Sequence, residues 1–461
     1  MHSFELGRVR SSTPLFHKCV IVPVTACVYA TILSPLLIYV AVGSITDLPL
    51  AEAHTLLMAP RPENKIFWPT LAAISIVLVV RNRSRLVGWS PHIIFLFAYL
   101  AFAGASVLWA FKPEFSFTRF VMQVMLVTSI VLPAMVADRK ADMMGGVFLC
   151  FAFASILNVF FVLGQNPIIL SNGNSIGYPG YFTFKGTLGE CAAITFLLSL
   201  HEVLYPGLRR VLGIIVIIIA TWLMFVSQSK GSLGLAIIAP LLAQLTLIAG
   251  KKMRISPAIV LLPIAFCYEI LSRIPGLNIM NRISWYLYEN YTFSGRAFIW
   301  DFVNYEIGRR PLLGWGFQSF WLVGPDAPSV VEAPGWIAAM PSAHSGYLDT
   351  QLDTGYVGFV IFIAFLIATL HAAGRMTDRD PARARLVLSL ALFIILTNTL
   401  ESTWMHGQDI LWVMFVIPTA EIGRYWRPFR PDVRPQYWPP FSPLRNVSRS
   451  ARKFARARTN P

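Results

Sequence analysis

Charged residues and cysteines are both scarce in this sequence. Only 13% of its 461 residues are charged, whereas 56% are hydrophobic, and the mean hydropathy is +0.60. Soluble domains carry about 25% charged residues, so the composition excludes an ordinary soluble protein and predicts an integral membrane protein. All cysteines fall in or beside apolar segments, where they act as small hydrophobic residues and form neither a disulfide framework nor a metal site: Cys19, Cys27, Cys150, Cys191 and Cys267.

Apolar stretches of about 20 residues, long enough to cross a bilayer as helices, recur from one end of the chain to the other. They predict an all-α polytopic membrane protein with about twelve transmembrane helices. The predicted helices are 18–42, 66–80, 91–111, 118–137, 143–164, 187–204, 210–227, 232–250, 256–273, 346–371, 386–400 and 409–423.

The distribution of basic residues tests this count. With both termini in the cytoplasm, 27 of the 38 Lys and Arg residues fall on the cytoplasmic side, as the positive-inside rule requires. Residues 1–423 are thus expected to form a transmembrane domain. Residues 424–461 are expected to form a disordered, basic, Pro-rich tail attracted to anionic membrane lipids. The first apolar segment is longer than the core of a signal peptide and is expected to remain as a span.

Two outer loops are long, about 22 residues before Lys185 and about 70 between Arg273 and His344, and long loops often carry function. The second, 274–345, is expected to be periplasmic and to carry part of a site. Eleven basic residues lie on this outer side, against the orientation bias, which indicates that something there requires positive charge.

Lys230 lies in the turn "SQSKGSLG" between two apolar helices. A lysine at membrane depth is costly unless it reaches the interface or meets an anion. One interpretation is therefore an interfacial anchor. The other is a phosphate ligand, supported by backbone N–H groups at the start of the next helix.

The segment "SGRAFIWDFVNYEIGRRPLLGWGFQSFW" predicts an amphipathic interfacial helix from Arg296 to Ile307, followed by a rigid re-entrant turn. Arg296 is either a functional cation or a structural partner of Glu289 or Asp301, while Arg309 and Arg310 are expected to contact the surface or lipid headgroups. The aromatic residues of the loop are equally compatible with sugar stacking and with interfacial anchoring; they include Trp315, Phe317, Trp321 and Trp336.

His344 opens the stretch "AHSGYLDTQLDTG", and Tyr347 and Gln351 follow it on one helical face. A lone histidine at a helix start is most often a cap, yet imidazole also transfers protons near neutral pH. Asp349 and Asp353 lie on a neighbouring face, and the helix dipole explains carboxylates at this position without a metal.

Taken in order, these stretches resemble the O-antigen ligase and polysaccharide polymerase superfamily, and in particular its exopolysaccharide polymerases. The loop "SVLWAFKPEFSFTRF", the Gly-Lys segment "GYFTFKGTLGECAA" and the late Glu motif "NTLESTW" are similar to family segments. "SQSKGSLG" carries Lys where Arg is usual, and "AHSGYLDTQLDTG" carries Ser345 where Asn is common.

The resemblance implies a GT-C-like, metal-independent glycosyltransferase without cofactors. Its donor would be a glycan on undecaprenyl pyrophosphate, its acceptor a glycan or glycolipid, and its site would face the periplasm. Its partners would include membrane lipids and other polysaccharide assembly proteins but no nucleic acid. Lys230 and Arg296 would neutralise the departing diphosphate, and His344 would take the acceptor proton. Further substrate-binding candidates are Lys185, Arg119, Tyr347, Gln351, Glu401 and Trp315.

Other functions remain open. The family also includes ligases that act on a lipid acceptor. A transporter or flippase would place ionisable residues deep in the bundle and would show repeated halves, and neither is apparent. A non-catalytic assembly scaffold is compatible with the Lys-for-Arg and Ser-for-Asn departures.

Overall fold

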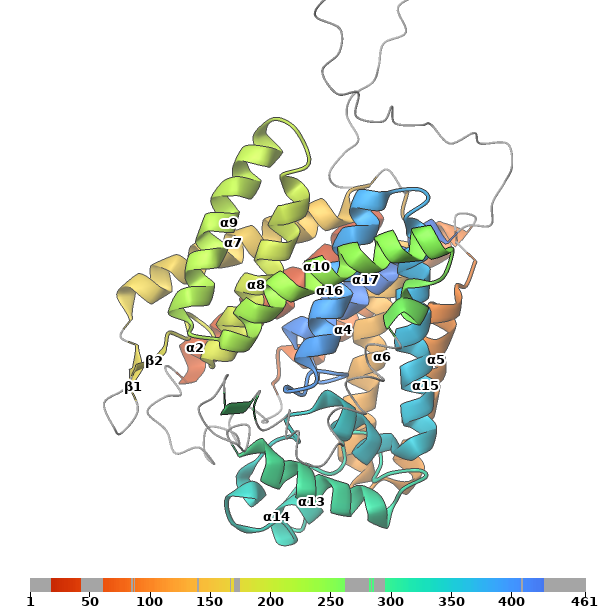
Figure 1. Ribbon diagram of the computed structural model, residues 1–461. Helices are drawn as coiled ribbons and strands as arrows, with labels where there is room; N and C mark the ends of the chain where they lie inside the picture. The colour runs from red at the N-terminus through yellow and green to blue at the C-terminus, as the bar shows by residue number, and fades with distance from the viewer. Residues whose placement is uncertain are drawn as a thin grey trace, which may run out of the picture. The chain divides into compact units, whose positions relative to one another are not determined.

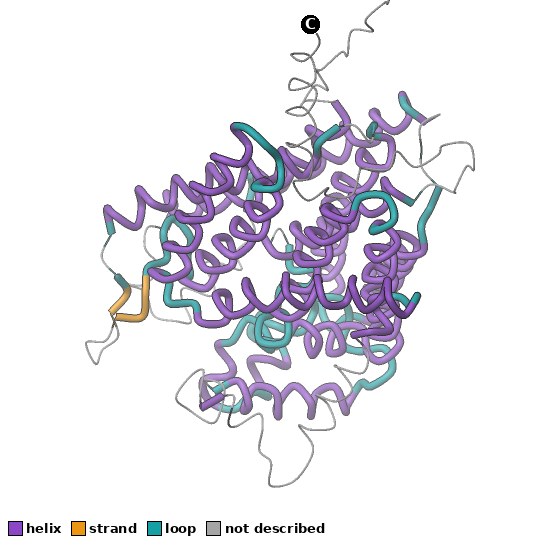
Figure 2. The backbone as a smooth tube through the Cα atoms, turned by 45° about the horizontal axis from the view of Figure 1, so that its top comes forward, coloured by secondary structure: helices purple, strands orange, loops and turns teal. Residues whose placement is uncertain are grey.

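The computed structural model describes residues 18–42, 61–83, 86, 88–138, 141–165, 167–169, 175–261, 282, 284–285, 295–407 and 409–426. The chain divides after Arg427 into two units, and every described residue belongs to the first, so the predicted tail lies outside the described residues. Helices make up nearly all of the regular structure (Figures 1 and 2), as expected for an all-α membrane protein.

The helices follow the predicted segments closely. Their bounds are α1 Lys18–Val28, η1 Tyr29–Leu33, α2 Ser34–Val42, α4 Asn64–Arg81, α5 Pro91–Ser106, η4 Val107–Trp109, α6 Pro113–Val136, α7 Met143–Gly164, α8 Lys185–Glu202, α9 Leu208–Val226, α10 Lys230–Met253, α13 Arg296–Arg309, α14 Pro328–Val331, η5 Gly335–Ala339, α15 Gly346–Met376, α16 Pro381–Thr397 and α17 Ile410–Tyr425. Two short strands, β1 Ile168–Ile169 and β2 Ser175–Gly177, pair antiparallel. The remaining predicted helix, 256–273, lies mostly outside the described residues.

Eight of the described helical segments are long and apolar enough to cross a membrane. The chain is therefore a polytopic membrane protein. The helices α16 and α17, with 17 and 16 residues, are shorter than these eight, so the full count of about twelve spans stays a prediction.

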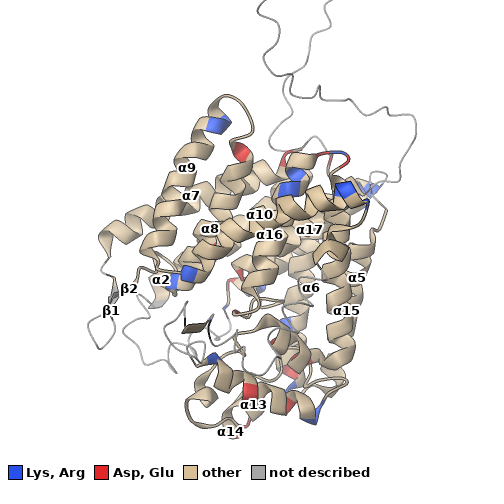
Figure 3. Ribbon diagram, viewed as in Figure 1, with Lys and Arg blue, Asp and Glu red and all other residues tan. Residues whose placement is uncertain are grey.

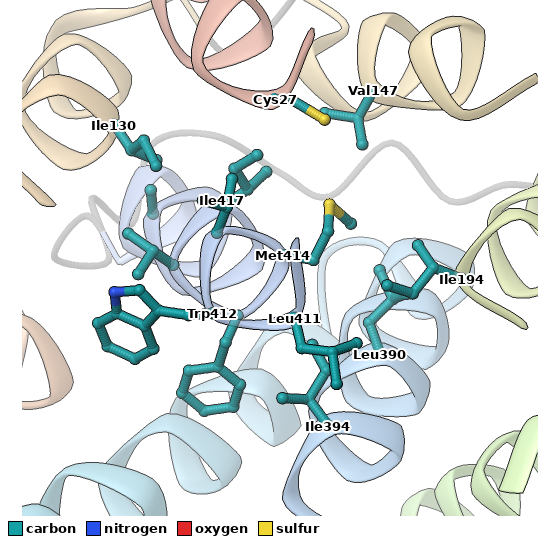
Figure 4. Close-up of a cluster of buried hydrophobic side chains, with 14 of the residues drawn as sticks. Cys27, Ile130, Val147, Ile194, Leu390, Ile394, Leu411, Trp412, Met414 and Ile417 are labelled. Carbon is teal, nitrogen blue, oxygen red and sulfur yellow. The ribbon is translucent and has the colours of Figure 1, made fainter. Parts of the chain in front are cut away.

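Helix α17 lies at the centre of the bundle. Every residue from Ile410 to Arg424 is buried, and the helix packs against α1, α6, α15 and α16. Figure 4 shows Leu411, Trp412 and Met414 of α17 among side chains from several other helices. Since lipid tails are as apolar as these side chains, close packing, rather than exclusion from water, holds such helices together.

Buried ion pairs explain why α16 begins earlier than hydropathy predicts. Arg383, in its first turn, contacts Glu421 of α17 at 2.6 Å, and Asp380 caps the helix by accepting from the Arg383 N–H at 2.9 Å. Glu421 also contacts Arg424 at 2.5 Å. Because its charge is paired, the helix extends to Pro381 instead of starting at residue 386.

Helix α15 is broken at Gly355, where φ is 62° and ψ is −168°. The segment 311–316 lies against the break, and its backbone takes up hydrogen bonds that the helix lacks there. These bonds are Trp315 N to Leu352 O at 2.9 Å, Gly316 N to Asp353 O at 2.9 Å, Tyr356 N to Pro311 O at 2.8 Å and Val357 N to Leu312 O at 3.2 Å. The expected rigid turn thus exists and is joined to a transmembrane helix.

The loop between α10 and α15 has a hydrophobic core of its own. The buried face of α13 packs with loop aromatics in a cluster separate from that of the bundle, which contains Ile299, Phe302, Val303, Ile307, Trp315, Phe320 and Trp321. The predicted helix at Arg296 is therefore present, but the loop itself covers its apolar face, so its placement at the membrane interface stays a prediction.

Replacing Gly355 tests the joint between α15 and the loop. A Cβ there would lie 2.3 Å from the carbonyl carbon and oxygen of Leu312, and the backbone conformation is nearly exclusive to glycine. We expect Gly355→Ala to destabilise the protein by about 2 kcal/mol or more, measured by thermal unfolding in detergent.

The matched control is Gly308→Ala. Gly308 is an exposed residue of α13 with nothing within 4 Å of an added Cβ, so alanine there should stabilise the helix slightly. Equal unfolding temperatures for the two variants would show that the close approach at Gly355 does not exist.

Candidate functional site

Arg296, His344 and Glu401 meet although they are far apart in the sequence. Arg296 Nη2 donates a hydrogen bond of 2.7 Å to Glu401 Oε1, and His344 Nδ1 lies 3.4 Å from Glu401 Oε2. The three side chains are partly exposed, at 15%, 31% and 39% respectively. A carboxylate thus connects the first residue of α13 to the histidine that precedes α15, and all three groups remain accessible.

The backbone around His344 is held in an unusual conformation. Its φ is 48°, in the left-handed region that side chains other than glycine seldom adopt. The following residues are fixed by the turn after α16, because Ser345 N donates to Ser402 Oγ at 2.9 Å and Gly346 N donates to Glu401 O at 2.9 Å. Strain of this kind persists only where the surroundings enforce it, so the imidazole position is determined by the turn that carries Glu401.

Asn398 holds that turn together. Its Oδ1 accepts hydrogen bonds from Thr403 N at 3.0 Å and Trp404 N at 3.2 Å. A Cβ at Gly346 would lie 2.3 Å from the same oxygen, so the start of α15 presses directly on Asn398. The "NTLESTW" motif is therefore a turn that positions Glu401 against the beginning of α15.

Electrostatics favour an ionised Glu401. Burial alone would raise its pKa, but the hydrogen bond with His344 and the charge of Arg296 hold the pKa of Glu401 below its usual range. With an ionised partner, Nδ1 of His344 is assigned as the donor, which leaves Nε2 with a lone pair that can accept a proton.

A second carboxyl group lies nearby. Burial raises the pKa of Asp409 to about 7, with the charge of Glu401 adding to the shift. Asp409 accepts hydrogen bonds from Leu411 N at 2.8 Å and Trp412 N at 3.4 Å, and so caps α17. Glu190 of α8 is close enough to interact with the charges of both Glu401 and Asp409. Within the described ranges, no three His, Cys, Asp or Glu side chains are grouped so as to hold a metal ion.

Lys230 and Lys185 form a separate pair of cations. They begin α10 and α8 respectively, and their charges are close enough to interact; Figure 3 shows basic residues where these helices begin. Gly189 allows the close packing, because a Cβ there would lie 2.4 Å from Ser229 Cβ. Glu190 is the next residue, so the lysine pair and the Glu401 cluster are both neighbours of the first turns of α8.

Arg119 anchors the loop to the bundle. Its Nη1 donates to Gln318 O, and Gln318 Nε2 in turn donates to Met405 O. Met405 lies in the same inter-helix turn as Glu401, so the contacts of Arg119 connect α6 with two parts of the site region. The predicted substrate-binding role of Arg119 stays a prediction.

The remaining predicted binding residues occupy different environments. Tyr347 donates its hydroxyl to Ile395 O at 2.8 Å, Gln351 is half-buried on α15, and Trp315 is only 4% exposed, donating to Glu306 O at 3.1 Å. Among the four loop aromatics, Phe317 and Trp321 are buried as well, whereas Trp336 is 50% exposed. Trp336 also lies beside Gly295, 3.2 Å from the position of an added Cβ, and hence next to Arg296.

The family model described as O-antigen ligase matches residues 214–363, about a third of the chain. This segment is similar to O-antigen ligases and is called the ligase-domain segment below. A protein of Rickettsia felis named as a candidate polysaccharide ligase is 23% identical over 126 residues. That alignment covers 26% of this chain and 31% of the relative.

The suspected resemblance to the O-antigen ligase superfamily is thereby confirmed. The ligase-domain segment contains Lys230, Arg296 and His344 but ends before Glu401. The carboxylate on which two of these residues converge therefore lies outside the matched region, in the turn before α17.

The structure also places residues that the sequence analysis did not select. Asn398, Asp409 and Glu190 all lie in or beside the cluster. The sequence signal that could have identified them is a polar residue at the end of an apolar helix, the same signal that indicated His344. Arg296 is paired with Glu401, a partner that the sequence analysis did not propose. Of the structural partners that it did propose, Glu289 lies outside the described residues, so that pairing stays a prediction.

Replacing Glu401 by glutamine tests the charge at the centre of the cluster. A carboxylate whose pKa is lowered in the folded state adds stability above its unfolded pKa, about 4.3, and loses it as the pH falls through the folded value. We expect Glu401→Gln to unfold at a lower temperature than the wild type at pH 7, with the difference narrowing below about pH 4.3.

Thermal unfolding across pH 3–8 measures this effect. Glu332→Gln serves as a control because its partner Arg309 is 41% exposed, against 15% for Arg296, and pairs with exposed cations contribute about 0–1 kcal/mol. A temperature difference for Glu401→Gln that stays constant over the whole pH range would contradict the ionised state assigned to Glu401.

Proposed function

We propose that this protein is a glycosyltransferase of the bacterial inner membrane. It moves a glycan from undecaprenyl pyrophosphate to a glycan or glycolipid acceptor at the periplasmic face. The observation that supports this most directly is the joint contact of Arg296 and His344 with Glu401, which sets a phosphate-binding cation beside an acid–base group. The O-antigen ligase match over the same segment supports the class of reaction.

The proposed step is a displacement at the anomeric carbon of the donor. The acceptor hydroxyl oxygen attacks that carbon, the bond from the carbon to the pyrophosphate oxygen breaks, and the electron pair leaves with undecaprenyl pyrophosphate. The hydroxyl proton passes to Nε2 of His344. Glu401 holds the imidazole through Nδ1 and stabilises the imidazolium that forms.

Cations assist because negative charge grows on the diphosphate as the bond breaks. Groups that bind the transition state more tightly than the substrate accelerate the reaction. A guanidinium has five N–H donors in a fixed fork, so Arg296 holds Glu401 and contacts phosphate at once. Lys230 and Lys185 supply the second cationic patch, and Lys acts there as a point charge.

Trp336 completes the proposed site as a surface for a sugar ring. It is the exposed member of the four loop aromatics and adjoins Arg296 through Gly295. An exposed indole offers an apolar face and an N–H donor, which suits stacking on a pyranose. We assign the burial of Trp315 to loop packing and do not include it in the proposed site.

Within this class, we favour polymerisation of exopolysaccharide or O-antigen repeat units over ligation to a lipid. The proposal rests on the order of motifs that resemble exopolysaccharide polymerases. The same proposal includes a GT-C-like arrangement, metal-independent catalysis and partnership with other polysaccharide assembly proteins.

Substitution of His344 and Arg296 tests the reaction directly. We expect His344→Ala and Arg296→Ala each to lower the transfer rate by at least about 100-fold, the usual contribution of a general base or a fixed charge. The assay incubates purified protein with an undecaprenyl-pyrophosphate oligosaccharide in chelator and follows extended glycan and released lipid pyrophosphate by mass spectrometry.

Arg310→Ala is the matched control, since Arg310 stacks on Trp315 at 4.1 Å and lies outside the cluster. Full transfer by either test variant would remove that residue from its role. If the wild type is inactive on every donor but moves lipid-linked glycan across vesicles, the protein is a flippase; inactivity in both assays favours a scaffold.

The lysine pair gives an independent test. Hydrogen bonds to charged groups contribute about 1.5–3 kcal/mol, so Lys230→Gln should lower kcat/KM for the donor about 10–100-fold. Lys230→Arg keeps the charge and should retain transfer. Equal loss in both variants would show that residue 230 acts through shape and not through charge.

A further inference from the structure

A cavity of about 500 Å³ lies at the far end of α15 from His344. It is formed where α10 ends, where the chain turns through residues 255–257, and where α15 reaches its last turns. The 31 residues of α15 correspond to roughly 45 Å of helix, so this cavity is separate from the Glu401 cluster. Figure 3 shows basic residues near the end of α10.

The cavity wall carries a concentration of positive charge. Lys251 lies in the last turn of α10 and Arg254 directly follows that helix, whereas His371 and Arg375 lie four residues apart on one face of α15. All four side chains are exposed and line the cavity, together with one carboxylate, Asp378. The balance of three fixed cations against one anion favours a negatively charged ligand.

Two glycines allow the turn to close the cavity. A Cβ at Gly374 would lie 2.3 Å from Pro257 Cδ, and one at Gly250 would lie 2.9 Å from Ile255 O. His371 Nδ1 is 2.9 Å from Ser256 Oγ, which ties the turn to α15. The wall is therefore held in place by backbone contacts on both helices.

A buried hydroxyl group in the wall has no hydrogen-bond partner among the described residues. The Oγ1 atom of Thr377 is inaccessible to solvent and unpaired, and Thr377 lines the cavity. Buried polar atoms are nearly always hydrogen-bonded in folded proteins, and an exception calls for a missing water or ligand. Because the atom is closed off from solvent, a ligand with acceptor oxygens contacts it once the Thr377 side chain rotates toward the cavity.

We infer that the cavity binds the phosphate of an anionic phospholipid headgroup. Its position at the ends of two membrane-spanning helices is where lipid phosphates lie, and basic pockets at such positions bind anionic headgroups. Apolar side chains at the rim, Leu247 and Ile255, suit the glycerol and first acyl carbons of the lipid. Arg375 stacks on Trp426 at 4.6 Å, which limits its freedom before binding. The inference does not depend on the proposed transfer reaction.

Lipid retention by the full chain tests the inference. Purified protein is exposed to phosphatidylglycerol or phosphatidylcholine in detergent, and bound lipid is counted by native mass spectrometry. We expect the wild type to retain phosphatidylglycerol preferentially. The double variant Lys251→Gln/Arg375→Gln should weaken retention at least about tenfold, since it removes two of the three fixed cations that line the cavity.

The control is Arg81→Gln/Arg83→Gln, which removes two exposed cations at the end of α4 and should leave retention unchanged. Thr377→Val keeps the net charge and removes only the hydroxyl, so it should also weaken retention while general membrane attraction stays constant. Equal retention by the cavity variant and the control would overturn the inference.

Inorganic phosphate distinguishes a lipid from a free anion. We expect phosphate at millimolar concentration neither to displace phosphatidylglycerol nor to raise the unfolding temperature as the lipid does. If inorganic phosphate stabilises the wild type fully and the lipid adds nothing, the cavity is a site for a free anion and the lipid assignment is wrong.

Discussion

The contact of Arg296 and His344 with one carboxylate is the interaction on which the site depends. Glu401 sits in a turn that Asn398 holds against the start of α15, while Arg296 starts a helix of the outer loop. Partly exposed ion pairs add little to stability, so this arrangement is better explained by what it positions. It sets a fixed positive charge and an imidazole side by side on one carboxylate.

The loop that supplies Arg296 is made rigid by its joint with the bundle. Helix α15 lacks some of its own backbone hydrogen bonds around Gly355, and the segment 311–316 supplies hydrogen bonds in their place. The same helix begins beside His344 and ends at the basic cavity. A single interrupted helix thus connects the loop that supplies Arg296, the Glu401 cluster and the basic cavity.

Hydropathy predicted most of the helices, and motif order selected His344, Arg296 and Glu401, because apolar length and polar groups at helix ends are local signals. The structure brings these three side chains together, while their roles stay predictions. Contacts between distant segments left no such signal. Nothing in the sequence indicated that Arg296 pairs with Glu401, a residue 105 positions away, or that Asn398 shapes the turn. The sequence also does not indicate which aromatic residues are exposed, because the burial of Trp315 and the exposure of Trp336 depend on how the loop folds on itself.

The central claim is that Glu401 acts on the reaction through His344, whose imidazole it holds. A double-mutant cycle on transfer rate with His344→Ala and Glu401→Gln tests it most directly, because residues in contact show non-additive effects whereas independent ones add. The account predicts that the double variant is little slower than the slower single variant. Rate losses that multiply across the two positions would show that the two side chains act independently and would contradict the account.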